Sequence, residues 1–98
     1  MRVFTLVTGT YAAGATNGPA VFFEPLGRTG TAVIQFGGAT VGSGYMTLQG
    51  RMSSDLSWTN ITTDAAGAIQ IVVQMPQYRV AINNGTGSST TFNAVIGA

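Results

Sequence analysis

The sequence predicts an all-β fold, a single antiparallel β-sandwich of about eight short strands in a jelly-roll-like arrangement that spans residues 1–98. Three observations support this prediction. Apolar residues recur with a period of two, turn-forming residues separate these runs at intervals of roughly 8–12 residues, and no segment shows a helical period. A chain of 98 residues and 10.1 kDa is expected to form one domain.

The first half of the chain contains four predicted strands: residues 3–8, 19–24, 31–36 and 45–52. The third places Ala32, Ile34 and Phe36 on one face. The fourth alternates as well, with Met46, Leu48 and Met52 on one face and Thr47, Gln49 and Arg51 on the other. Glycine-rich loops are predicted at 9–18 and 37–44, and Pro25 ends the second strand.

The second half contains four more predicted strands: residues 58–61, 68–75, 78–82 and 90–96. Ser53–Asp55 is a predicted turn, because Ser and Asp side chains bond to their own backbone there. The segment 83–87, Asn-Asn-Gly-Thr-Gly, is typical of a hairpin, since Asn and Gly tolerate positive φ. Between these turns, Tyr78, Val80 and Ile82 are expected to point inward.

The segment 68–75 has the strongest strand signal in the chain. Four apolar side chains share one face, which we expect to look inward: Ile69, Ile71, Val73 and Met75. The segment carries no charge, and at an exposed sheet edge it would invite aggregation. It should therefore be central in a sheet or covered by a partner.

The composition argues against an enzyme. The chain has no Lys, His or Cys, so the usual titrating groups, thiolates and Schiff-base amines are missing. Its three carboxylates, Glu24, Asp55 and Asp64, lie in separate turn-like contexts and are not expected to form an acid–base pair. A structural zinc site needs Cys or His. We expect no catalytic residue, no metal and no cofactor.

Nucleic acid and membrane are poor candidates for a partner. The four arginines leave a net charge of +1 and form no basic stripe. No window approaches the ~18 apolar residues of a membrane helix. Only 7% of residues are charged, against about 25% in ordinary domains, so the exterior must consist of small neutral side chains. Covering such a surface costs little desolvation or side-chain entropy, which favours a permanent assembly.

The aromatic residues allow three interpretations. Trp58 with Tyr45 and Tyr78 is compatible with a sugar-stacking platform or with a protein interface. A single Trp at the start of a strand is more often a core anchor, and we favour that interpretation.

Two arginines, Arg51 and Arg79, fall on the outward side of neighbouring strands. They can pair with Asp55 or Glu24. Either they are solvated surface side chains, or they make directional contacts between subunits, since Arg is enriched in protein interfaces.

One part of the chain resembles a known family. Its residues are Leu48-Gln49-Gly50-Arg51-x-Ser53-x-Asp55-x-x-Trp58-x-x-Ile61, followed by Pro76-x-Tyr78-Arg79-Val80. This pattern, within residues 45–96, resembles small β-sandwich structural proteins of tailed bacteriophages.

The resemblance implies a structural protein of the virion. The first expectation is a capsid decoration (cement) protein on the capsid surface, a homotrimer that binds across seams between major capsid protein subunits. The expected contact residues are Arg28, Arg51, Arg79, Tyr11 and Tyr45. The alternatives are a carbohydrate-binding module on a tail or cell surface and a ring-forming tail or connector subunit.

Overall fold

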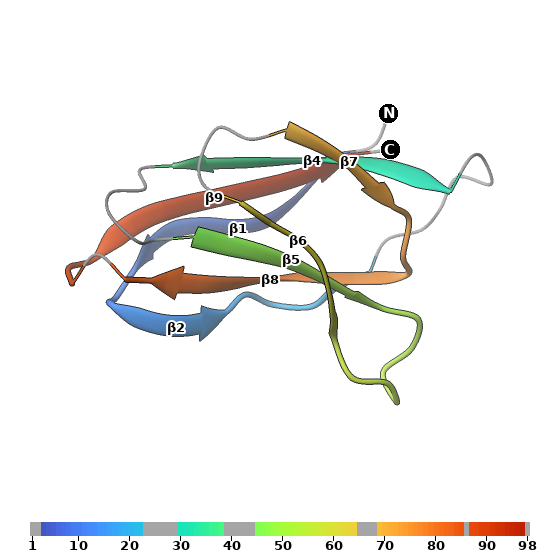
Figure 1. Ribbon diagram of the computed structural model, residues 1–98, viewed down its shortest axis with the longest axis horizontal. Coiled ribbons are helices and arrows are strands. Elements are labelled where there is room, and N and C mark those ends of the chain that lie inside the picture. The colour runs from blue at the N-terminus through green and yellow to red at the C-terminus, as the bar shows by residue number, and fades with distance from the viewer. Residues whose placement is uncertain (1–2, 23–29, 39–44, 65–68, 86, 98) are drawn as a thin grey trace.

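The regular structure of the described residues consists of strands. The computed structural model describes residues 3–22, 30–38, 45–64, 69–85 and 87–97. The strands in these ranges are β1 (Val3–Tyr11), β2 (Gly14–Asn17), β3 (Val21–Phe22), β4 (Thr31–Gly38), β5 (Tyr45–Arg51), β6 (Thr59–Asp64), β7 (Ile69–Val73), β8 (Gln77–Asn84) and β9 (Thr90–Gly97) (Figure 1).

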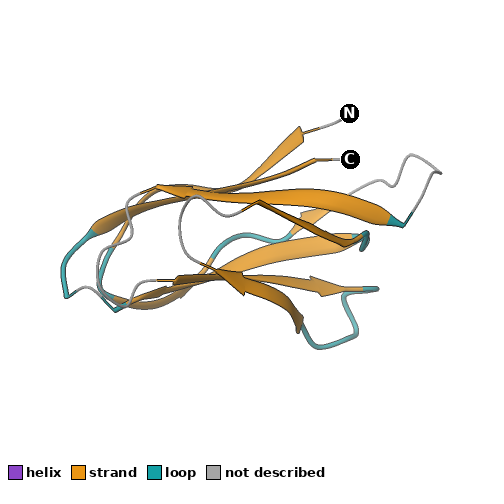
Figure 2. Cartoon of the chain, turned by 45° about the horizontal axis from the view of Figure 1, so that its top comes forward, coloured by secondary structure: helices purple, strands orange, loops and turns teal. Residues whose placement is uncertain are grey.

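The strands belong to two antiparallel sheets that pack face to face (Figure 2). We call them the β9 sheet, with the order β1-β9-β4-β7, and the β8 sheet, with the order β2-β8-β5-β6; β3 also pairs with β8. Successive strands alternate between the two sheets, except that β3 follows β2 and β6 follows β5 within the β8 sheet. This order is that of a jelly roll, and it confirms the predicted fold class.

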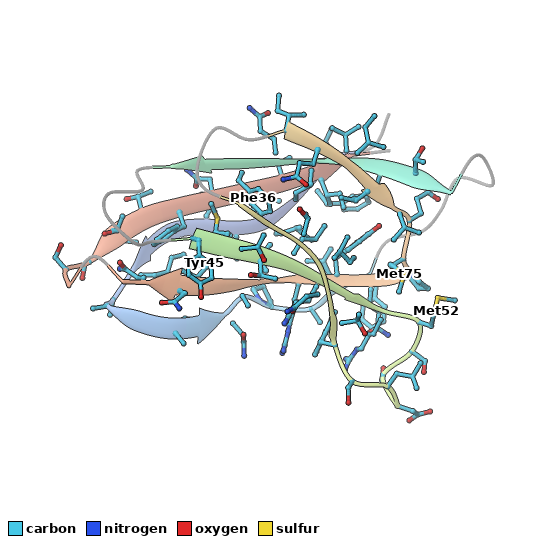
Figure 3. All side chains as sticks on the ribbon, viewed as in Figure 1. Phe36, Tyr45, Met52 and Met75 are labelled. Carbon is cyan, nitrogen blue, oxygen red and sulfur yellow. The ribbon has the colours of Figure 1, made fainter. Side chains whose placement is uncertain are left out.

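The core lies between the two sheets and follows the predicted alternation on most strands. The sets predicted to face inward on β4 and at the start of β8 are buried, and Phe36 lies between the sheets (Figure 3). The buried apolar residues are Leu6, Val7, Ala32, Ile34, Phe36, Met46, Leu48, Val72, Tyr78, Val80, Ile82, Phe92, Ala94 and Ile96.

A β-bulge in β1 adds a side chain to this core. Leu6 and Val7 are consecutive and both buried, which a regular strand does not allow. The register with β9 shifts between Thr5 and Val7, so that Leu6 is the extra residue. The bulge therefore turns both side chains inward.

The segment 9–18, predicted as a loop, contains strand structure instead. β1 continues to Tyr11, and β2 pairs with β8 along its whole length. All four residues of β2 are exposed, so no alternation of apolar and polar residues marks it. It is an edge strand held by its backbone hydrogen bonds to β8.

The predicted hairpin at 83–87 is wrong, because β8 and β9 lie in different sheets. Asn83 and Asn84 are the last residues of β8, and the chain then passes to β9 in the other sheet. Asn84, 1% exposed, donates from its side-chain nitrogen to the carbonyl oxygens of Tyr11 (3.0 Å) and Ser88 (2.8 Å). Asn84, which contributed to the hairpin prediction, therefore stabilises the start of this connection through its buried side-chain amide.

The predicted orientation of the segment 68–75 is also wrong for most of its residues. β7 is the edge strand of the β9 sheet, and Val72 points into the core. Gln70 points to the same side as the buried Ile34 opposite it and accepts a hydrogen bond from Thr62 of β6. This bond gives the inward-facing side chain of Gln70 a hydrogen-bond partner. Because side chains alternate along a strand, Ile69, Ile71 and Val73 then face outward. Met75, beyond the strand, packs against the core as expected.

Met52 departs from its predicted face because β5 ends one residue earlier, at Arg51. Its side chain is 61% exposed and projects beyond the strand (Figure 3).

Hydrogen bonds of the Tyr78 hydroxyl stabilise the connection between β7 and β8. Its buried hydroxyl donates to the Val73 carbonyl oxygen (2.6 Å) and accepts from the Met75 N–H (2.8 Å). Burial raises the pKa of Tyr78 above its ordinary value of 10.0, and the Met75 hydrogen bond offsets part of that rise. Folding therefore favours the neutral phenol.

We expect Tyr78→Phe to lower the free energy of unfolding by about 1–3 kcal/mol, because two backbone groups lose their partner. In the wild type, the stability from the raised pKa is complete below pH 10.0 and declines as the pH rises through the raised value. The Tyr78→Phe variant should lose less stability over the same alkaline range, because it has no hydroxyl at this position to ionise. Urea denaturation from pH 7 upward measures both effects.

Tyr45→Phe is the matched control, since the Tyr45 hydroxyl lies at an exposed position. It should change stability by less than about 0.5 kcal/mol. Equal alkaline losses in wild type and Tyr78→Phe would contradict the role given to Tyr78.

Candidate functional site

An uncovered apolar region lies on the outer side of the β9 sheet. We call it the apolar face: Val3, Val33, Ile69, Ile71, Val73 and Val95. The side chains of Val3, Ile69, Ile71 and Val73 are 62%, 63%, 77% and 52% exposed. Contiguous exposed apolar side chains on a sheet usually mark a contact with another molecule.

The strand register brings these residues together. Val3 pairs with Gly97, Gly97 with Val33, and Val33 with Ile71, which makes one row across all four strands. Because Gly97 has no side chain, the row has a gap, and an open hollow of about 190 Å³ lies there. Its lining consists of Val3, Val33, Gln35, Val95 and Gly97.

The other end of the same sheet face is polar. Thr8 donates to the Asn93 side-chain oxygen (2.7 Å), and the hydroxyls of Thr10 and Thr91 lie 3.3 Å apart. These pairs satisfy each other across β1 and β9. The apolar face is therefore confined to one half of the sheet.

The outer side of the β8 sheet carries a cationic cluster. The guanidinium carbons of Arg51 and Arg79 lie 4.2 and 4.8 Å from the centre of the Trp58 ring. Arg51 belongs to β5, Arg79 to β8, and Trp58 immediately precedes β6. We call these three residues the arginine–tryptophan cluster. Both cations are attracted by the electron-rich face of the same indole.

Two glutamines hold the arginines in place. Arg51 Nε donates to Gln77 Oε1 and Arg79 Nε donates to Gln49 Oε1, each at 2.7 Å. In both pairs the two residues are direct neighbours across β5 and β8. The two bonds are therefore reciprocal, with one arginine and one glutamine on each strand.

The cluster has no internal counter-charge. Among the described side chains neither guanidinium forms an ion pair, so the pairing with Asp55 that the sequence allowed does not form. The side chains of Glu24 and Asp64 lie outside the described part of the structure. Desolvation, and next the positive charge of Arg51, lower the pKa of Arg79 from its ordinary value.

The remaining predicted contact residues lie apart from the cluster. Tyr45 is 41% exposed, and its hydroxyl accepts from the Asn83 side-chain nitrogen (2.9 Å). Tyr11 is half-buried, with its ring edge-on to Phe92 at 6.3 Å, and so has mainly a packing role. Arg28 lies outside the described residues.

Trp58 is not the core anchor that we favoured from the sequence. It lies half-buried on the outer side of the β8 sheet, whereas Tyr78 is fully buried, as are Phe36 and Phe92. The sugar platform of Trp58, Tyr45 and Tyr78 therefore does not form. No sequence signal identified the stacking of both arginines on Trp58, because it depends on the β5–β8 register.

The described residues contain no group of three or more His, Cys, Asp or Glu side chains that could hold a metal ion. In the same part of the chain no helix is long and apolar enough to cross a membrane. Comparisons with protein-family models, curated proteins and solved structures gave no match.

We expect Trp58→Ala to cost only about 1–2 kcal/mol of stability, the loss of two exposed cation–π contacts and some packing. Deleting a Trp from a core costs about 3–5 kcal/mol. Denaturation followed by far-ultraviolet circular dichroism measures the difference, since the variant has no other Trp. A loss in the core range would contradict the peripheral role of this ring.

Proposed function

We propose that this protein is a structural subunit of a tailed-bacteriophage particle, a capsid cement protein on the capsid surface. It binds across seams between major capsid protein subunits as a homotrimer, and it acts by binding and not by catalysis. The observation that carries the proposal is the uncovered apolar face on the β9 sheet. The virion setting rests on the resemblance of residues 45–96 to phage structural proteins.

The apolar face needs a protein to cover it. β7 is an edge strand with three exposed β-branched side chains and no charged residue among them, the arrangement that soluble sheet proteins usually avoid. Because the face carries no charge, a matching apolar surface of another subunit can cover it without leaving a charge unpaired. The major capsid protein is the proposed occupant.

The size of the face favours an assembly over an isolated pair of molecules. Strand spacings of about 4.8 Å and rises of about 3.3 Å per residue give it a footprint of roughly 300 Å². A stable standard interface buries about 800 Å² on each partner. The apolar face is thus too small to act alone, and it suits a subunit that makes several contacts at once.

The two candidate regions lie on opposite sides of the sandwich, one outside each sheet. A subunit with contact regions on both sides can join two neighbours, which a seam requires. Binding only to the assembled capsid stabilises that state by mass action. Jelly rolls also build viral capsids and lectins, although fold alone does not assign function.

The alternatives are weaker on the same observations. A carbohydrate-binding module would need Tyr78 on its sugar platform, but Tyr78 is buried. In addition, two guanidiniums already contact the Trp58 ring. A ring-forming tail or connector subunit would use the same two faces. Native mass spectrometry separates it from a cement protein, since rings contain more copies than a trimer.

We expect particles that lack the protein to release their DNA at a lower temperature than complete particles. Adding wild-type protein back should restore the higher temperature, and Ile71→Asp should not. Ile71 is 77% exposed, so the variant should fold with nearly unchanged stability. Its carboxylate would be buried without a partner at the contact and should weaken particle binding at least tenfold.

Thr91→Asp is the control, because it adds the same charge to the polar half of the same sheet face. It should bind and protect like the wild type. Full protection by Ile71→Asp, or particles equally heat-resistant without the protein, would refute the cement assignment.

A further inference from the structure

We infer that the arginine–tryptophan cluster is a carboxylate-binding site, which anchors an acidic side chain of a protein partner. The inference deepens the proposed function, since it names the chemistry by which one face of the subunit recognises its neighbour. It uses the opposite side of the sandwich from the apolar face and can be tested without a particle.

The first argument is the supply of hydrogen-bond donors. A guanidinium has five N–H donors, and here the Nε of each arginine is already used by a glutamine. The Nη groups of Arg79 have no partner in the part of the chain that the structure describes, and Arg51 Nη1 makes only a long contact of 3.5 Å with the Leu56 carbonyl oxygen. These donors match the two oxygens of a carboxylate.

The second argument is that both guanidiniums are already held. Each is fixed by a short bond to the glutamine across the ladder and by the Trp58 ring. Much of the rotamer entropy that an arginine loses on binding is therefore lost on folding. Pre-organised donors of this kind bind more tightly than free surface arginines.

The third argument is charge. Two cations share one aromatic ring, and Asp55, the carboxylate whose side chain the structure describes, does not pair with either of them. An arriving anion removes the repulsion between the two arginines and adds charge-assisted hydrogen bonds.

The surroundings point to a protein as the source of the carboxylate. Phe22 of β3 pairs with Gln77 of β8, and Gln77 pairs on its other side with Arg51 of β5. The Phe22 side chain is 70% exposed. Met52 and Leu56, in the loop after β5, are 61% and 53% exposed. Aromatic residues, Met and Arg are the types enriched in protein interfaces. Two cations amid apolar side chains would neutralise too few phosphates to hold a nucleic acid.

The test uses Trp58, the single tryptophan of the chain, as its own reporter. The full-length protein is titrated with a blocked tetraglutamate peptide while Trp emission is recorded. We expect a saturable change that weakens as salt is added. A blocked tetraglutamine peptide should produce no comparable change. Inorganic phosphate should produce a smaller change at equal concentration, because it makes no contact with the apolar side chains around the cluster.

Gln49→Glu tests the assignment within the same fold. The new carboxylate can still accept from Arg79 Nε, and it places a negative charge inside the cluster. The variant should bind tetraglutamate at least tenfold more weakly and melt no lower than wild type. Thr91→Asp, which adds the same charge to the polar half of the outer side of the other sheet, should leave the titration unchanged.

Three results would overturn the inference: equal responses to tetraglutamate and tetraglutamine, equal responses to tetraglutamate and phosphate, or undiminished binding by Gln49→Glu. The particle experiment with Ile71→Asp probes the other face. The cement proposal can therefore fail while the peptide still binds, and the peptide can fail to bind while particles are still protected.

Discussion

The structure depends on one apolar layer, in which the inner faces of the two sheets pack against each other. Each strand has two sides, and only one can contribute to that layer. Seven charged side chains would not be enough to cover both outer surfaces, so Thr, Asn, Gln and aliphatic residues form most of the exterior. The proposed role builds on this division, since it assigns the outer sides of the two sheets to contacts with other subunits.

The sequence predicted the fold class and most of the core. In the run 78–82 apolar residues alternate with Arg79 and Ala81, and in the run 31–36 Val33 is the one large apolar residue on the outward side, so a period of two identifies the inner side. β2 was missed because all of its residues are exposed and only backbone bonds define it. The crossing at 83–87 was read as a hairpin because its Asn and Gly residues favour a tight turn in either setting.

Orientation was harder to predict than the position of a strand. On β7 the three residues of one side and Val72 of the other are all apolar, so hydrophobicity cannot decide which side is buried. The choice depends on Gln70, whose amide meets Thr62 of β6 across the edge of the sandwich. Such a contact joins two sheets and has no local signature. The same holds for Trp58, whose neighbours Arg51 and Arg79 are brought together by strand register alone.

The missing side chain of Gly97 bears on how the apolar face would position the proposed partner. Contacts between aliphatic groups are non-directional, so a flat face of valines and isoleucines would accept a neighbour at many positions along the sheet. The gap at Gly97 interrupts that flatness between Val3 and Val33. In the proposed contact, one protruding side chain of the neighbour would enter this gap and so fix where the neighbour sits along the sheet, a selectivity of position that uncharged contacts alone lack.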